Sequence, residues 1–96
     1  MSKKVNVTFY AQTIKNQEKG GAWLTTIHIT DEGMDTPNQV ITSAWSNASA
    51  AKRWIKEMVQ QLTPRKSVKM IATTQNLDAK GKPLAFVGQI GYKRDA

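Results

Sequence analysis

Apolar and polar side chains alternate near the start of the chain. Residues 5–11 read Val-Asn-Val-Thr-Phe-Tyr-Ala, with a period of two that is typical of a half-buried β-strand. A polar stretch that ends in Gly20 and Gly21 follows, and residues 23–29 then place one Trp, one Thr and two Ile side chains on one face. We therefore expect these two segments to form a β-hairpin.

The residues after this hairpin combine a turn with a third strand. Residues 31–38 contain Gly33 and Pro37 among acidic side chains, a composition typical of turns. Residues 40–45 begin with Val-Ile-Thr and end in Trp45, and this β-branched run predicts a short strand.

The clearest pattern in the chain predicts a helix over residues 48–62. This stretch contains no Gly or Pro, Ser46 or Asn47 can cap its free amide groups, and Pro64 ends it. Apolar side chains recur at helical spacing and widen into a stripe, so we expect this face to pack on the sheet. The stripe comprises Ala48, Ala51, Trp54, Ile55, Met58, Val59 and Leu62.

Two more strands are expected after the helix. Residues 68–72 alternate in polarity, a polar turn covers residues 75–82, and residues 84–92 supply apolar side chains for a last strand. Gly88 and Gly91 lack side chains inside that strand, which indicates a bulge or a close approach of two backbones.

These elements predict one α+β domain over residues 1–96, a length sufficient for a single small core. We expect two layers, an antiparallel sheet of about five strands with one amphipathic helix on one face, in the order β-β-β-α-β-β. Residues also match between the two hairpins at a constant spacing, such as Gly20 with Gly81. Shared turn chemistry and an internal repeat both explain this match.

The positive charge is concentrated in the second half of the chain. Residues 1–48 contain four basic and four acidic groups, whereas residues 49–96 contain ten basic and three acidic groups, so the whole net charge of +7 falls there. A negatively charged partner is therefore expected to bind the second half.

The residue inventory argues against an enzyme, a metal site and a bound cofactor. The chain has no cysteine, and its one histidine, His28, is out of phase with the apolar side chains of its strand. Asp31, Glu32 and Asp35 share a loop, but they lack the spacing of a calcium-binding loop. No glycine-rich loop precedes the helix, as a nucleotide site requires. We expect no catalytic residues.

The best binding candidates are basic residues on and after the helix. Lys52, Arg53 and Lys56 lie within about one turn of each other on the side opposite the apolar stripe, although such charges are often only a solvated face. Further cations follow the helix and occupy the last turn, so the full candidate set is Lys52, Arg53, Lys56, Arg65, Lys66, Lys80 and Lys82.

Two aromatic residues are candidates for an interface. Trp45 lies where the third strand meets the helix, and Tyr10 lies on the strand face opposite Phe9. Either can stack on a base or anchor a protein contact if it is exposed, and core packing is the alternative for both. We assign Trp23 and Trp54 to the core.

These features favour a small, non-enzymatic basic protein that contacts the backbone of DNA or RNA through a basic helix face. The alternative is a small phage-type inhibitor or adaptor that binds an acidic surface of a host protein or nucleoprotein complex. In a third interpretation the charge serves only solubility. An exposed edge strand can also pair with a second copy to form a homodimer.

The start of the chain lacks the apolar run of a signal peptide or a membrane span. Together with the missing cysteines, this favours a cytoplasmic protein that does not associate with membranes.

Overall fold

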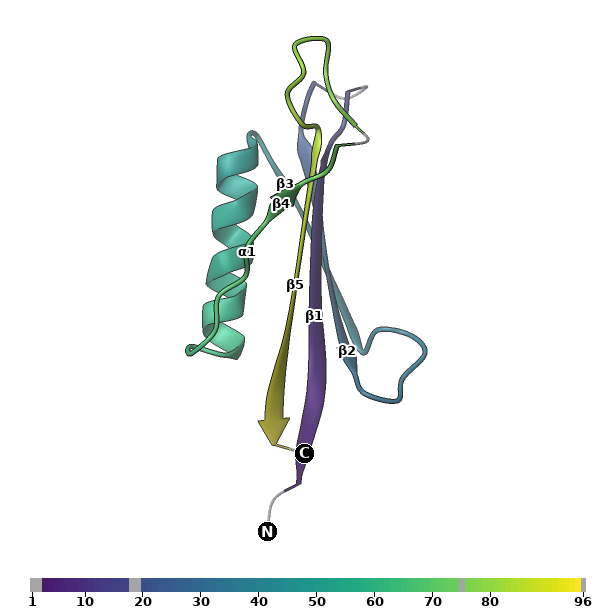
Figure 1. Ribbon diagram of the computed structural model, residues 1–96, viewed down its shortest axis with the longest axis vertical. Helices are drawn as coiled ribbons and strands as arrows, with labels where there is room; N and C mark the ends of the chain where they lie inside the picture. The colour runs from purple at the N-terminus through teal and green to yellow at the C-terminus, as the bar shows by residue number, and fades with distance from the viewer. Residues whose placement is uncertain (1–2, 18–19, 75, 96) are drawn as a thin grey trace.

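The computed structural model describes residues 3–17, 20–74 and 76–95, and it confirms an α+β fold of two layers (Figure 1). A five-stranded antiparallel sheet forms one layer and a single helix forms the other. The elements follow one another as β1 (Lys4–Lys15), β2 (Trp23–Asp31), β3 (Gln39–Trp45), α1 (Ala48–Leu62), β4 (Ile71–Ala72) and β5 (Ala85–Asp95).

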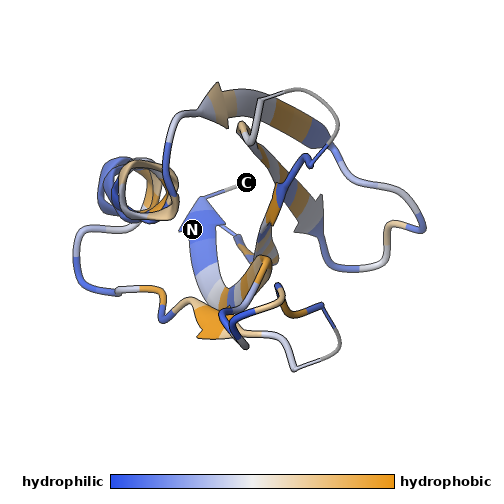
Figure 2. Ribbon diagram, turned by 90° about the horizontal axis from the view of Figure 1, so that it is seen from above, coloured by the Kyte–Doolittle hydropathy of each residue, from blue (hydrophilic) through white to orange (hydrophobic). Residues whose placement is uncertain are grey.

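The strands lie in the order β3-β2-β1-β5-β4, so β1 is central and β3 and β4 are the two edges. The first two strands form the predicted hairpin, with Tyr10 opposite His28. The helix α1 leaves one edge strand and leads to the other, because it follows β3 and precedes β4. It therefore covers one face of the sheet and leaves the other face open (Figures 1 and 2).

The core lies between the helix and the sheet. Alternate residues of β1 and β2 point toward the helix, as the period of two predicts. Viewed from above, the helix turns its hydrophobic residues toward the sheet and its hydrophilic residues away (Figure 2). The central buried side chains are Val7, Phe9, Ile27, Ile55 and Val59.

The helix has the predicted bounds because local signals define both of its ends. The Asn47 side chain accepts a hydrogen bond from the Ala50 amide at 2.8 Å, so Asn47 is the N-cap. The Thr63 amide still donates to the Val59 carbonyl, and Pro64 follows it. One expected member of the apolar stripe differs: Leu62, in the last turn, is 39 % exposed.

One pair of threonines is fully buried beside the apolar core. Thr13 of β1 and Thr25 of β2 are cross-strand neighbours that both point toward the helix layer. Their hydroxyl oxygens are 2.9 Å apart and share a hydrogen bond. Each hydroxyl thus satisfies the other, which offsets the cost of burying two polar groups.

The segment between the helix and β4 crosses over β5 instead of pairing with it along its whole length. The strand expected over residues 68–72 is reduced to the two residues of β4, because Val68 points into the core and is only 3 % exposed. Gly88 of β5 lies directly beneath this crossing. The prediction of a close backbone approach is confirmed at Gly88, whereas a Cβ at Gly91 would make only an ordinary contact with the Val7 carbonyl oxygen, at 3.9 Å.

The two hairpins share turn chemistry but differ in their strands. Gly20 and Gly81 both have positive φ, at 71° and 81°. However, β1 has twelve residues and β4 has two, so the two hairpins are not equivalent units. The last turn runs over residues 76–84 in the described part of the chain, and Gln75 lies outside the described residues.

Candidate nucleic-acid interface

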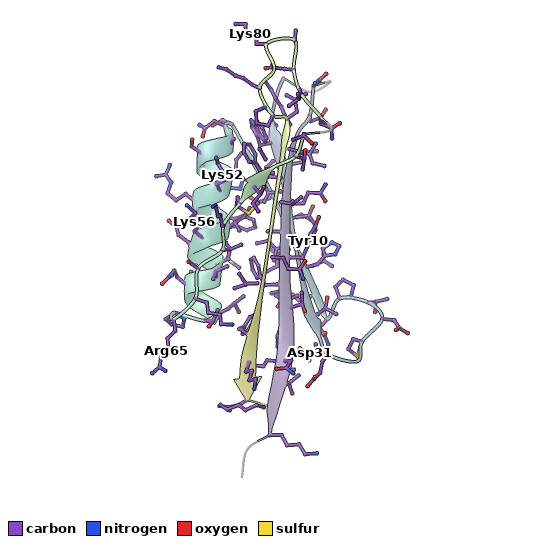
Figure 3. The ribbon with its side chains drawn as sticks, viewed as in Figure 1. Tyr10, Asp31, Lys52, Lys56, Arg65 and Lys80 are labelled. Atoms are coloured by element: carbon purple, nitrogen blue, oxygen red, sulfur yellow. The ribbon has the colours of Figure 1, made fainter. Side chains whose placement is uncertain are left out.

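The helix positions its three predicted basic residues differently. Successive helical residues are about 100° apart, and the buried Ala51 and Ile55 define the inner side. Arg53 and Lys56 are exposed on the outer side. Lys52 is half-buried at the flank of the helix that faces β5, and Figure 3 shows Lys52 and Lys56 one turn apart.

Lys52 is held in place by an aromatic ring. Its Nζ lies 4.2 Å from the centroid of the Phe86 ring on β5, and that ring in turn lies 5.8 Å from the ring of Trp23. The negative face of an aromatic ring attracts a cation, a contact that is worth about 0.5–1 kcal/mol when it is exposed. Lys52 therefore combines a structural contact with its positive charge.

Arg65 and Lys66 follow the helix, and their side chains differ in how they are held. Arg65 is exposed and extends away from the foot of the helix (Figure 3). The Lys66 ammonium instead donates a hydrogen bond to the Gly91 carbonyl oxygen, and the Gln60 side chain donates to the Lys66 carbonyl at 3.3 Å. Lys66 thus fastens the helix exit to β5.

Lys80 and Lys82 lie in the turn before β5, at one end of the molecule. The Asp78 side chain accepts hydrogen bonds from both of their backbone amides, each at 2.8 Å, and Gly81 between them supplies the positive φ of the turn. Both side chains are exposed. Figure 3 shows Lys80 at the far tip of this turn, beyond one end of the helix, and Arg65 at the other end of the helix.

The ion pairs of the described residues lie elsewhere. Lys4 pairs with Asp95, and Arg94 pairs with Asp31, at the end of the sheet where the described chain begins and ends. The hydrogen bond to the Asp31 carboxylate raises the pKa of Arg94 above its ordinary value. Within the described ranges, no carboxylate lies within ion-pair distance of a cation on the helix or in the last turn.

The acidic loop is tied to the sheet. Asp31 binds Arg94, and the Glu32 carboxylate accepts hydrogen bonds from the amide and the side chain of Asn6, at 3.3 and 3.0 Å. Among the residues that the structure describes, no three His, Cys, Asp or Glu side chains are grouped as a metal site would require. The chemistry available on the helix-bearing side is therefore that of exposed cations.

The two candidate aromatics lie on opposite faces of the sheet. Tyr10 is on the open face, where its ring meets the ring of His28 edge-on with centroids 6.4 Å apart. Trp45 is on the helix side, half-buried, with its ring centroid 5.9 Å from that of Trp54. Because the sheet separates them, Tyr10 does not share a surface with the basic helix (Figure 3).

Trp45 and Arg53 line the same shallow hollow beside the helix, together with Trp54 and Glu57. The structure thus places an indole ring next to one of the exposed cations. We expected Trp54 in the core, and its side chain is half-buried and packs against the core residues.

Sequence reasoning missed one cation, Lys69. It lines a shallow hollow on the open face with Tyr10, Ile71 and Gln89. Lys69 lies between Val68, which is buried, and Met70, which is half-buried, and this alternation is the signal that would have identified it as an exposed cation.

In the described part of the chain, no helix combines the length and the apolar character that crossing a membrane requires. No protein-family model matches the chain, and no curated protein and no solved structure matches it either.

Proposed function

We propose that this protein is a non-enzymatic nucleic-acid-binding protein, and that it contacts the phosphate backbone with its helix-bearing side. The observation that carries the proposal is the distribution of ion pairs: the two ion pairs of the described residues, Lys4–Asp95 and Arg94–Asp31, lie at the far end of the sheet, and the exposed cations of the helix and the last turn form none. Such cations release counterions when they meet phosphates, which favours binding.

The dimensions of this side suit an extended polyanion. A fifteen-residue helix is about 22 Å long, and B-DNA carries one charge per about 1.7 Å of its axis, so the helix alone spans several phosphates. Lys80 lies beyond one end of the helix and Arg65 at its other end, so they extend the basic surface past both ends of the helix (Figure 3). The apolar stripe of the helix packs against the sheet, and Arg53 and Lys56 are exposed to solvent.

The proposed binding is largely independent of sequence. Phosphate contacts position a protein on nucleic acid without reading its bases. Of the two aromatic candidates, Tyr10 lies behind the sheet from the basic helix, and Trp45 is half-buried with its ring packed on that of Trp54 (Figure 3). The proposal places the protein in the cytoplasm, where it meets DNA and RNA.

The test compares charge reversals on two sides of the molecule. Arg53→Glu, Lys56→Glu and Arg65→Glu are combined in one variant, because these three side chains are exposed. Lys52 and Lys66 are left intact, since their contacts with Phe86 and Gly91 make a loss of folding hard to separate from a loss of binding.

The matched control combines Lys3→Glu, Lys69→Glu and Lys93→Glu, which changes the net charge equally with exposed residues away from the helix. Fluorescence anisotropy then measures the affinity of each protein for a labelled DNA duplex, a single strand and an RNA hairpin at about 50–200 mM salt.

If each reversed residue contacts one phosphate, the helix variant loses about 2.7 from the slope of log affinity against log salt, because each contact contributes about 0.9. The control keeps most of that slope. Equal losses in the two variants refute the proposed surface. A wild-type protein that does not bind at the lowest salt refutes the function and leaves an acidic protein partner or a role in solubility as the explanations of the basic side.

A further inference from the structure

The two edges of the sheet differ in how well they are protected against pairing. Edge strands present unpaired N–H and C=O groups, and proteins protect them with short strands, charges, proline or bulges. The edge strand β4 has only two residues. The other edge, β3, has seven, and its sequence Gln-Val-Ile-Thr-Ser-Ala-Trp contains no charge and no proline.

The sequence of β3 allows two copies of the strand to pair antiparallel with each other. In an antiparallel pair centred on Thr42, each Thr42 faces the Thr42 of the other copy, Val40 faces Ala44, and Ile41 faces Ser43. No pair in this register sets like charges against each other. Val40 is 54 % exposed, so a neighbouring Ala44 would cover an apolar side chain that is now in water.

We propose that two copies of this protein pair antiparallel along β3 and join their two five-stranded sheets into one continuous sheet. The proposed occupant is a second copy because the register centred on Thr42 sets no like charges opposite each other and covers the exposed Val40 of each copy with Ala44 of the other. The dimer does not depend on the nucleic-acid binding proposed above.

The helix layer is compatible with this dimer. The helix packs over β1, β2 and β3, so its axis lies near β2, and the two helices of the dimer would be separated by about three strand spacings, or about 14 Å. Packed helices approach to about 8–10 Å, so they do not collide. Lys52 lies on the flank toward β5 and therefore away from the junction.

The experiment places a charge at the centre of the proposed pair. Thr42 is exposed, and Thr42→Lys or Thr42→Glu sets two like charges opposite each other in a dimer centred there. The control is Thr26→Lys, because Thr26 is the neighbour of Thr42 on β2 and shares its face, but is one strand farther from the junction. Sedimentation velocity measures the dimer Kd, and circular dichroism verifies that each variant is folded.

We expect the wild type and Thr26→Lys to dimerise with similar Kd values, and each Thr42 variant to dimerise at least about tenfold more weakly. An equimolar mixture of Thr42→Lys and Thr42→Glu should recover the dimer as a mixed pair. A monomeric wild type overturns the proposal. A dimer that the Thr42 variants leave intact also overturns the proposal. So does a dimer that Thr26→Lys weakens as much as the Thr42 variants do, because that result indicates packing through the open face of the sheet.

Discussion

A methyl group added at Gly88 tests the crossing of the helix-to-β4 segment over β5. A Cβ at this position would lie 2.6 Å from Met70 Sδ, 2.8 Å from Val68 Cγ2 and 3.0 Å from the Lys69 carbonyl oxygen. The Met70 sulfur can move aside, because its side chain is flexible. Val68 is β-branched and buried, and the Lys69 oxygen belongs to the backbone, so neither can yield without a shift of the segment.

The expected cost follows from these two rigid contacts. Forcing extra atoms into a packed core typically costs about 1–3 kcal/mol, so Gly88→Ala should destabilise the fold by that amount. In a domain of this size, 1 kcal/mol lowers the melting temperature by about 4–8 °C. A loss of 2 kcal/mol therefore corresponds to about 8–16 °C.

Gly91→Ala is the matched control in the same strand. Its Cβ would meet only the Val7 carbonyl oxygen, at 3.9 Å, and neither glycine has a positive φ. Where the native backbone accepts Ala without strain, replacing Gly by Ala stabilises the folded protein by about 0.4–1 kcal/mol, because it lowers the conformational entropy of the unfolded chain. Urea unfolding followed by tryptophan fluorescence gives both free energies. Equal stabilities for Gly88→Ala and Gly91→Ala would refute the close crossing.

Two further predictions concern buried polar groups. Thr13→Val alone should destabilise the fold by about 1–3 kcal/mol, because it leaves the Thr25 hydroxyl unpaired. The double variant Thr13→Val with Thr25→Val should recover most of that loss in a thermal melt. Additive losses from the two substitutions would contradict the shared hydrogen bond. Burial raises the pKa of Tyr92 above its ordinary value of 10.0, so the unfolded chain ionises first and the free energy of unfolding should fall as the pH rises through about 10. Urea unfolding at rising pH measures this fall, which Tyr92→Phe should reduce; an unchanged fall in that variant would exclude Tyr92 as its cause.

The helix and the three long strands were predictable because local chemistry specifies them. Asn47 and Pro64 define the ends of α1 through a side-chain hydrogen bond and a missing amide, which need no distant partner. The length of β4 was not predictable in this way. Residues 68–70 alternate like a strand, but Val68 is used to fill the core between the helix and β5, so the segment leaves the sheet.

The candidate site was predictable only in part. The residues were identifiable as exposed cations, but their partners were not. Lys52 meets the Phe86 ring and Lys66 meets the Gly91 carbonyl, each across a long stretch of sequence. Arg53 and Glu57 are four residues apart on the helix, yet they do not form one of the ion pairs of the described residues.

The sequence by itself determined the two-layer α+β fold and the side of the helix that meets water, because alternation and helical spacing are local periodicities. Only the tertiary structure decided the order of the strands, which leaves β3 as a long, neutral edge. It also decided which cations are paired, since Arg94 reaches Asp31 across the width of β1. Strand pairing joins residues that are far apart in the chain, and no local pattern encodes which of them become neighbours.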